Sequence, residues 1–324
     1  VLFMNNIHGA RLNTDLLERK GSGYVGRHGK DFLLANDSWS QLLDMQYGPD
    51  GSVHIIDWYD KNQCHSPNPD VHQKTLGRIF KVSHRDDEWV RVDLREKSGA
   101  ELVALQLHEN DWYVRHARRI LQERGADPSV HAKLREILDD NPDVTRRLRA
   151  LWALHVTEGL DDDALIALLS DPDEHVRAWS IRLLAEDRDV PEAGMESFVD
   201  LAREDPSPLV RLELASALQR MPPESRWDVL AALYARSEDA DDHNLPLMIW
   251  YAAEPLVPLD MDRALTMALE SDLPYLLPHT VERIAAIRTP EAIRTISTHL
   301  SRINDRGTQK ELLRGLNLML SGAE

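Results

Sequence analysis

The sequence predicts a multidomain β plus α protein, in which a small β-rich part is followed by an array of paired α-helices. Up to about residue 84, short apolar runs alternate with glycine, Asn-Asp and Pro-Asp-Gly, a pattern typical of strands joined by tight turns. From about residue 98, apolar residues follow the helical period, and an arginine motif recurs at spacings of 32, 30 and 34 residues. We therefore expect a β part at residues 1–84, a connector at 85–97 and a helical part at 98–324.

The strands of the β part are predicted from apolar runs bounded by turn residues. These runs are Val1–Met4, Phe32–Ala35, Leu42–Met45 and Val53–Ile56. Between the last two, the sequence GPDG at residues 48–51 predicts a hairpin, because proline presets φ and Gly51 can take a positive φ. The returning strand then places residues 57–60 at its far end.

The helical part is predicted to be an α-solenoid of HEAT-type repeats with a somewhat short period. Each motif carries an arginine four residues after an aspartate or a serine, where the second helix of a pair begins; these arginines are Arg115, Arg147, Arg177 and Arg211. Neither helix of a pair could bury its apolar stripe alone, so neighbouring repeats must stack. We expect six or seven helix pairs between residues 111 and 320, and a capping box at Ser98 and Glu101.

The recurring arginines are predicted to be structural and not a ladder for ligands. Asp111, Asp143 and Asp173 each precede an arginine by four residues. At that spacing an ion pair contributes about 0.2–0.5 kcal/mol, and the acid also suits a helix N-terminus. The aromatic residues of the array are likewise expected in the core first and on a partner surface second; they are Trp152, Trp179, Trp250 and Tyr251.

Composition and charge exclude several classes of protein. The net charge is −17, and residues 1–84 hold nine basic and nine acidic residues, so the remaining 29 basic and 46 acidic residues carry the whole imbalance. A surface this acidic repels phosphate, which argues against a HEAT-type nucleic-acid enzyme. No apolar run approaches the roughly 18 residues that span a bilayer, and the lone Cys64 cannot form an internal disulfide.

Several long motifs resemble one family over nearly the whole chain. They are HGxRxN from His8, GRHGKDFLLANDSW, GPDGSVHIIDWYDKNQCH, GRIFKV, ELVALQLHENDWYVRHARRILQERG and DDHNLPLMIWYAAEPL. In this order they resemble the PVC-type membrane-bound dehydrogenase proteins. Those are exported bacterial proteins in which a propeller related to the soluble sugar dehydrogenases is followed by HEAT repeats and often by a cytochrome c domain.

The resemblance implies that residues 1–84 are the last one or two blades of a β-propeller and that the protein is periplasmic or exported. The chain begins at Val1 without an initiator methionine or a signal peptide. A propeller needs at least about four blades. We therefore expect a C-terminal fragment that lacks the cytochrome c domain and the family's catalytic histidine, which leaves the catalytic residues unknown.

Neither cofactor of the family is expected in this chain. Covalent haem needs two thiols in a C-x-x-C-H motif, but Lys61 stands where the first cysteine before Cys64 would be. In the related quinoprotein dehydrogenases, two arginines grip the carboxylates of pyrroloquinoline quinone. The equivalent positions here are Gln41 and Leu43, which cannot make these contacts.

Polar residues near the predicted strand ends are candidates for a ligand-binding propeller mouth, with a small molecule or carbohydrate as ligand. They are His8, Arg11, Asp37, Asp57 and Asp60. The alternative is that such residues cap turns and satisfy backbone groups. No pair has the spacing of a metal site.

Two functions therefore remain for this chain. The first is a fragment of an exported dehydrogenase-like protein, with a substrate-binding propeller part and a HEAT array as interaction scaffold, and without catalysis on its own. The second is a pure protein–protein interaction module with no redox role. In both, the solenoid binds a protein partner.

Overall fold

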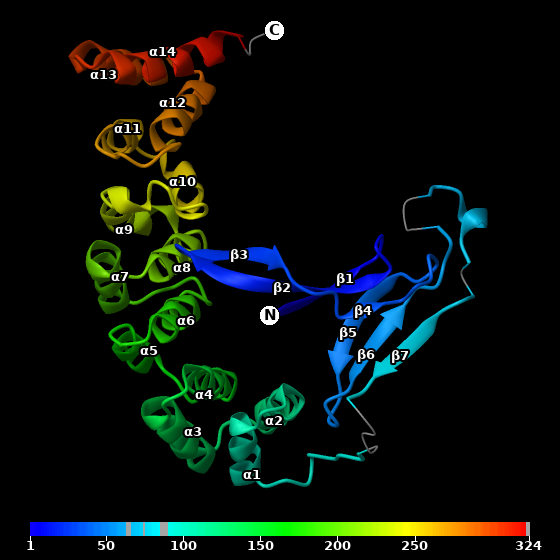
Figure 1. Ribbon diagram of the computed structural model, residues 1–324. Coiled ribbons are helices and arrows are strands. Elements are labelled where there is room, and N and C mark those ends of the chain that lie inside the picture. The colour runs from blue at the N-terminus through cyan, green and yellow to red at the C-terminus, as the bar shows by residue number, and fades with distance from the viewer. Residues whose placement is uncertain (63–65, 74, 85–89, 322–324) are drawn as a thin grey trace. The chain divides into compact units, whose positions relative to one another are not determined.

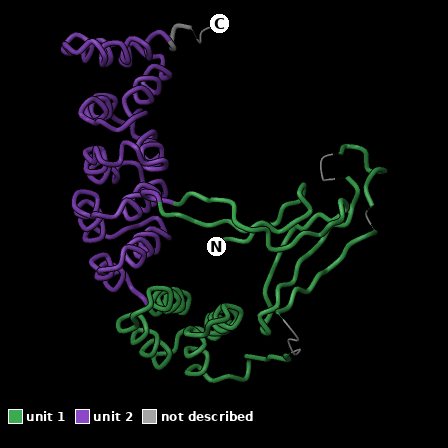
Figure 2. Tube along the Cα trace, in the orientation of Figure 1, with its two compact units in different colours: residues 1–19, 24–159 green, residues 20–23, 160–324 purple. Residues whose placement is uncertain are grey.

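The computed structural model describes residues 1–62, 66–73, 75–84 and 90–321 (Figure 1). It divides into two compact units (Figure 2). Unit 1 comprises residues 1–19 and 24–159, and unit 2 comprises residues 20–23 and 160–324. The change from strand to helix falls between residues 82 and 99.

The described residues of the β part form two small antiparallel sheets. The first has the order β1-β2-β3, with β4 also paired to β2, and the second has the order β5-β6-β7. The strands are β1 (Leu2–Asn6), β2 (Arg11–Lys20), β3 (Gly23–His28), β4 (Leu33–Leu34), β5 (Leu42–Tyr47), β6 (Val53–Asp57) and β7 (Arg78–Val82). Leu12, Leu42 and Ile55 are fully buried and form the small core of this part. Within the described residues both sheets are open, and they do not close into a propeller.

The predicted GPDG hairpin is confirmed. Gly51 has a φ of 78°, and the N–H of Gly48 donates to the carbonyl oxygen of Ser52 at 2.8 Å. The Asp50 carboxylate accepts from the N–H of Ser52 at 3.1 Å. The turn therefore folds for the reasons seen in its sequence, which are a glycine with positive φ and an aspartate that bonds the backbone two residues on.

The hairpin of β2 and β3 was not predicted from the sequence. Its strands carry mostly polar or exposed residues, and Leu12 is the fully buried side chain of β2. Strands of this kind lack the alternation of apolar and polar residues that identifies a half-buried strand. The turn joining them, at residues 21 and 22, lies in unit 2.

In unit 1 the second sheet contacts the first helices through the GPDG turn. The Asn110 side chain caps α2 by accepting from the N–H of Trp112 at 2.9 Å, and its Nδ2 donates to the carbonyl oxygen of Gly48 at 2.9 Å. The Tyr47 hydroxyl donates to Asp111 at 3.0 Å. The expected connector contributes no regular secondary structure at residues 90–97, and its residues 85–89 lie outside the described part.

The remainder of the chain is helical, as predicted. The α-helices are α1 (Gly99–Ala104), α2 (Asp111–Arg124), α3 (Pro128–Asp140), α4 (Val144–Val156), α5 (Asp162–Leu168), α6 (Glu174–Leu184), α7 (Glu192–Glu204), α8 (Pro208–Leu218), α9 (Trp227–Tyr234), α10 (Leu245–Ala253), α11 (Met261–Leu269), α12 (Leu276–Ile287), α13 (Pro290–Arg302) and α14 (Arg306–Ser321). Short 3₁₀ turns lie at Pro69–Val71, Leu105–Leu107, Pro223–Arg226, Ser237–Asp239 and Glu254–Leu256. The capping box of α1 at Ser98 and Glu101 is confirmed.

Unit 2 stacks its helices in two layers. Helices α5, α7, α9, α11 and α13 pack in sequence along one layer, and α6, α8, α10, α12 and α14 pack along the other (Figure 1). Among the described residues, five helix pairs thus stack in unit 2 as a HEAT-type array, and in unit 1 α1 packs on α2 and α3 on α4. Among the described residues, no helix is both long and apolar enough to cross a membrane.

The aromatic residues of the array divide between core and surface. Trp250 is 9% exposed and belongs to the core, as expected, whereas its neighbour Tyr251 is 49% exposed. Trp152 and Trp179 are half-buried, with Arg118 and Arg182 stacked over their rings. The core-first interpretation therefore holds for Trp250 and not for Tyr251.

Candidate functional site

Two of the five candidate residues of the β part meet on one arginine. Arg78 of β7 donates to Asp57 from Nε at 2.8 Å and from Nη2 at 2.6 Å, and its Nη1 reaches Asp37 at 3.4 Å. Asp57 is 1% exposed and also accepts from the N–H of Gln41 at 2.6 Å. The Arg78 guanidinium lies 3.7 Å from the centre of the Tyr59 ring. Asp57 is therefore a buried and fully engaged structural carboxylate.

Asp60 is buried in the same way, because it closes the loop that follows β6. It accepts from the N–H of Asn62 at 2.9 Å and of Gln73 at 2.9 Å, and it faces His72 Nδ1 at 3.2 Å. Burial raises the pKa of Asp60, but these hydrogen bonds outweigh it and hold the pKa below its usual value. This arrangement agrees with the alternative that such residues cap turns.

His8 and Arg11 lie on the other sheet, at the β1–β2 hairpin. Arg11 pairs with Asp31 at 3.2 Å, and His8 is exposed. The structure thus brings Asp37 and Asp57 together on Arg78, while Arg11 of the other sheet is engaged by Asp31. Among the described residues, no group of three or more His, Cys, Asp and Glu side chains is arranged to hold a metal ion.

The two positions compared with the quinone-binding arginines have different environments. Gln41 is 2% exposed, and its Nε2 donates to the carbonyl oxygens of Asp60 at 2.7 Å and Asn62 at 3.0 Å. Leu43 is 41% exposed. Gln41 thus holds the loop after β6 to β5. Cys64 and His65, on which the haem prediction depends, lie outside the described residues.

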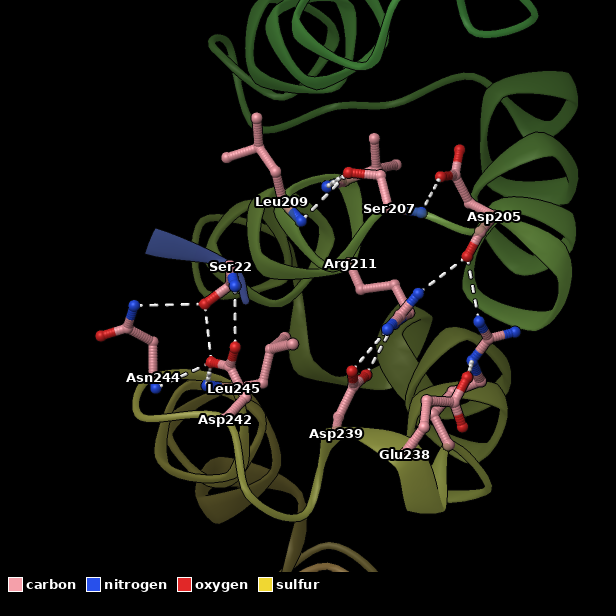
Figure 3. Close-up of polar contacts among 12 residues, drawn as sticks. Ser22, Asp205, Ser207, Leu209, Arg211, Glu238, Asp239, Asp242, Asn244 and Leu245 are labelled. Carbon is pink, nitrogen blue, oxygen red and sulfur yellow. Dashed lines mark hydrogen bonds and ion pairs between the residues drawn. The ribbon is translucent and has the colours of Figure 1, made fainter. Parts of the chain in front are cut away.

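Unit 2 contains a buried polar ladder built from two of the recurring arginines. Arg177 donates to Asp205 from Nε at 2.7 Å and from Nη2 at 2.9 Å. Arg211 donates to Asp239 from Nε at 2.6 Å, and Nη2 of Arg211 contacts the second carboxylate oxygen of Asp239 (Figure 3). We call these two ion pairs the arginine ladder.

Both rungs of the arginine ladder have the same geometry. Each arginine pairs with the aspartate 28 residues later, and its Nη1 donates to the carbonyl oxygen six residues earlier, at 2.8 Å in both cases. Asp205 belongs to both rungs, because its carboxylate binds Arg177 and its carbonyl oxygen accepts from Arg211. These two arginines therefore tie each repeat to the next, which is a structural role of the kind predicted.

The pairing of Arg177 with the aspartate four residues earlier was wrong, although an acid of an adjacent repeat does bind it. Asp173 caps α6 by accepting from the N–H of His175 at 2.8 Å, while Arg177, four residues on, binds Asp205. Asp143 likewise caps α4, and Arg147 donates to the carbonyl oxygen of Leu138 at 2.6 Å. A cap needs the side chain at the helix end, where it satisfies an otherwise unpaired N–H, so the carboxylate points away from the i+4 position.

The ladder ends in a compact loop that also binds a second segment. Asp239 closes the 3₁₀ turn Ser237–Asp239, and its carbonyl oxygen accepts from the N–H of Asp242 at 3.0 Å. Asp242, two residues before the N-cap Asn244 of α10, then accepts from the N–H groups of Asn244 at 2.9 Å and Leu245 at 3.0 Å. Arg211, through Asp239, thus fixes the loop that positions Asp242 (Figure 3).

Asp242 and Asn244 together hold the turn between β2 and β3, and we call them the clasp. The Ser22 hydroxyl donates to Asp242 Oδ1 at 2.6 Å, and the Ser22 N–H donates to Oδ2 at 2.7 Å. Asn244 Nδ2 donates to the Ser22 hydroxyl oxygen at 3.2 Å (Figure 3). Ser22 is 2% exposed, so the clasp and the turn exclude water from these bonds.

The negative charge of Asp242 is stabilised by hydrogen bonds from Ser22 and from the first residues of α10. Burial raises the pKa of Asp242, but hydrogen bonds from Ser22, Asn244 and Leu245 outweigh burial and place the pKa below its usual value. Asp242 is therefore ionised at neutral pH, and the bonds that it accepts from Ser22 are charge-assisted.

A polar groove lies near the first rung of the ladder, between the α5–α6 loop and α7. It has a volume of about 440 Å³ and its lining includes Asp171, Arg177, Asp200 and Glu204. Because Arg177 is already paired with Asp205, the groove presents excess negative charge. Such a groove suits basic groups.

Sequence reasoning missed Arg78 and the clasp. Arg78 stands in the GRIFKV motif and could have been suspected as the partner of buried Asp57. The clasp joins residues 220 positions apart, and no local sequence pattern predicts such a contact.

Comparison with known proteins identifies two matching regions. Residues 163–244 match a family model of HEAT repeats, and residues 4–86 match a domain of unknown function (DUF7133). No curated protein matches the chain. Crystal structures of two engineered proteins are similar at 21% and 19% identity, with TM-scores of 0.31 and 0.26; each match covers 70% of this chain, and 98% and 100% of theirs.

Proposed function

We propose that this chain is a protein-interaction scaffold whose helical unit binds a partner protein. The observation that carries the proposal is the HEAT-type array with a preformed clasp that already holds a non-helical segment. Stacked helical repeats offer extended binding surfaces. The arginine ladder stiffens this array at the loops where the clasp and the acidic groove lie.

Charge indicates the chemistry of the partner. Residues 160–324 hold 31 acidic and 16 basic residues, and residues 161–205 alone hold 14 acidic and four basic ones. A surface of this kind favours a partner with a basic face and speeds their encounter at low salt. We therefore expect binding to the α5–α7 region to weaken as ionic strength rises.

The test is to neutralise the groove and measure capture of partner proteins. In Asp200→Asn/Glu204→Gln, both changed side chains belong to the groove lining and are exposed, so the fold should persist. The matched control Asp139→Asn/Asp140→Asn removes the same charge from exposed positions of α3. The proposal expects proteins captured by the wild type and the control to be reduced with the groove variant and released by salt. Identical capture by all three proteins, or none by the wild type, would contradict it.

A second proposal concerns the β part, because the exposed face of its second sheet carries two large apolar side chains. Ile56 and Ile79 lie opposite each other on β6 and β7 and are 50% and 74% exposed. Their neighbours Ile55 and Phe80 point to the other face, where Ile55 is fully buried. A sheet inside a propeller is covered on both faces by neighbouring blades. This supports the interpretation of residues 1–84 as propeller blades.

A cavity of unit 1 is consistent with this second proposal. It has a volume of about 520 Å³ and a largely apolar lining, in which Phe3 and Phe32 meet edge to face at 5.2 Å. Such a lining suits another sheet better than a carbohydrate, which needs polar groups to orient it. In this proposal the parent protein is exported and dehydrogenase-like, this chain binds neither quinone nor haem, and the propeller mouth is completed by other blades.

The second proposal is tested by substituting the exposed face. Ile56→Lys/Ile79→Lys should leave this chain folded and make it more soluble, while preventing folding of a longer protein in which another blade covers that face. The control Leu16→Lys/Leu17→Lys changes exposed residues of β2. Equal tolerance of both double variants in the longer protein would reject the blade assignment.

A further inference from the structure

The clasp selects its ligand by hydrogen bonds that a serine can supply. Ser22 uses its N–H, its hydroxyl proton and its hydroxyl oxygen, and all three go to Asp242 or Asn244. Alanine would keep the N–H alone. Because bonds to a charged group contribute about 1.5–3 kcal/mol each, losing one corresponds to a ten- to hundredfold weaker contact.

Steric clashes with the clasp restrict the residues on either side of the serine to glycine. A Cβ at Gly21 would lie 2.1 Å from Asp242 Oδ2, and one at Gly23 would lie 2.8 Å from Asn244 Nδ2. Gly21 also has a φ of 54°, whereas Ser22 is not among the residues with positive φ, which is the pattern of a type II′ hairpin turn with glycine first. The clasp thus fits the sequence Gly-Ser-Gly in one turn geometry.

Within unit 2, the contact with the clasp is made by residues 21–23 of the turn. The large apolar residues beside it stay exposed: Leu17 by 46%, Tyr24 by 51% and Val25 by 41%. Little apolar surface is therefore buried around the turn, and its binding depends on the three residues that enter the clasp. A ligand held this way can be exchanged for another with the same three residues.

We propose that the clasp is a recognition site for Gly-Ser-Gly turns, in which the chain's own residues 21–23 are the resident ligand and a partner protein with such a turn binds when they leave. This rests on the proposed scaffold function and names the partner's chemistry at one site. While the resident turn occupies the clasp, the partner's turn is excluded. The partner's turn can therefore bind only after the chain's own residues 21–23 have left the clasp.

The test uses a cyclised fluorescent peptide with residues 17–26 and full-length variants. Gly21→Val should release the resident turn, because its side chain clashes with Asp242 and valine disfavours a positive φ. Fluorescence anisotropy should show the peptide binding this variant at least tenfold more tightly than the wild type. Gly21→Val/Asp242→Ala should lose that binding, as should a peptide with Ser22→Ala.

Two further variants keep the test decisive. Gly51→Val also places valine at a positive φ, of 78°, but nothing lies within 4 Å of the added Cβ. It should therefore bind the peptide no more tightly than the wild type does. Ser22→Asp releases the turn by charge repulsion from Asp242 without changing a glycine, and it replaces Gly21→Val if that variant does not fold. Equal peptide binding by the wild type and the released variants, or none by either released variant, overturns the proposal.

This experiment needs no native partner, so its outcome is separate from that of the scaffold proposal. Capture that depends on the acidic groove, without peptide binding, leaves the scaffold standing and removes the clasp as a partner site. Peptide binding without groove-dependent capture supports the clasp as a site for such turns and contradicts the scaffold proposal.

Discussion

Replacing Arg211 should destabilise the helical unit more than any loss of a surface charge. Arg211 is 3% exposed and Asp239 is 2% exposed, and the guanidinium also satisfies the carbonyl oxygen of Asp205 at 2.8 Å. Arg211→Met leaves the Asp239 carboxylate buried without its partner. Breaking one side of a buried pair costs about 3–5 kcal/mol. For a cooperative unit of roughly 150–250 residues, this lowers the melting temperature by about 6–20 °C.

Urea unfolding followed by circular dichroism, with calorimetry, measures this loss. The matched control is Arg119→Met, whose pair with Glu123 has side chains 77% and 59% exposed and should contribute less than about 1 kcal/mol. Arg211→Met/Asp239→Leu should recover much of the stability, because it removes the unpaired charge as well. The reasoning is refuted if Arg211→Met costs no more than Arg119→Met, or if the double variant is no better than the single one.

Three further outcomes are expected. Arg177→Met should also lower the melting temperature, by less than Arg211→Met because the Arg177 side chain is 11% exposed, and an equal or larger effect would contradict this. The fold lowers the pKa of Asp242, so the carboxylate should hold the turn fully above about pH 4 and release it as the pH falls through the folded pKa. Protection of the turn amides from hydrogen exchange should therefore decrease at low pH in the wild type, and it should not change in this way in Asp242→Asn. In the second proposal Gln41 and Leu43 stand at the positions of the quinone-gripping arginines, so calorimetry should detect no sub-micromolar binding of pyrroloquinoline quinone; Lys61 stands where a haem thiol would be, so spectra should show no Soret band.

The broad fold could be predicted because it depends on local pattern. The helical period and the GPDG turn at residues 48–51 are determined by neighbouring residues, and both are confirmed. The β2–β3 hairpin could not be found in this way. Its strands bury little, and its tip is held by Asp242, far along the chain.

The role of the arginines could be predicted, but not their partners. A tie between repeats follows from the recurrence itself, whereas the choice between an acid at i−4 and one at i+28 is made by tertiary packing. Arg177 and Arg211 are each followed by an aspartate after 28 residues, but so is Arg115, whose counterpart Asp143 caps α4, so this spacing alone does not identify the rungs. Arg147 has His175 and not an acid at that position.

For the candidate site residues, the residue type alone could not distinguish a ligand-binding role from a structural one. Asp57 and Asp60 were chosen because acids near strand ends often bind ligands, yet both are buried and saturated by their own chain. That distinction depends on burial and on the partner Arg78, which the local sequence does not reveal.

The most direct test of the central claim, that the helical array holds a Gly-Ser-Gly turn in its clasp, is hydrogen exchange at the Ser22 amide. This amide donates to Asp242 at 2.7 Å in a residue that is 2% exposed. Mass spectrometry of peptides covering residues 20–24 should therefore show slow exchange in the wild type and fast exchange in Asp242→Ala. Fast exchange in the wild type, or exchange unaffected by Asp242→Ala, would contradict the account.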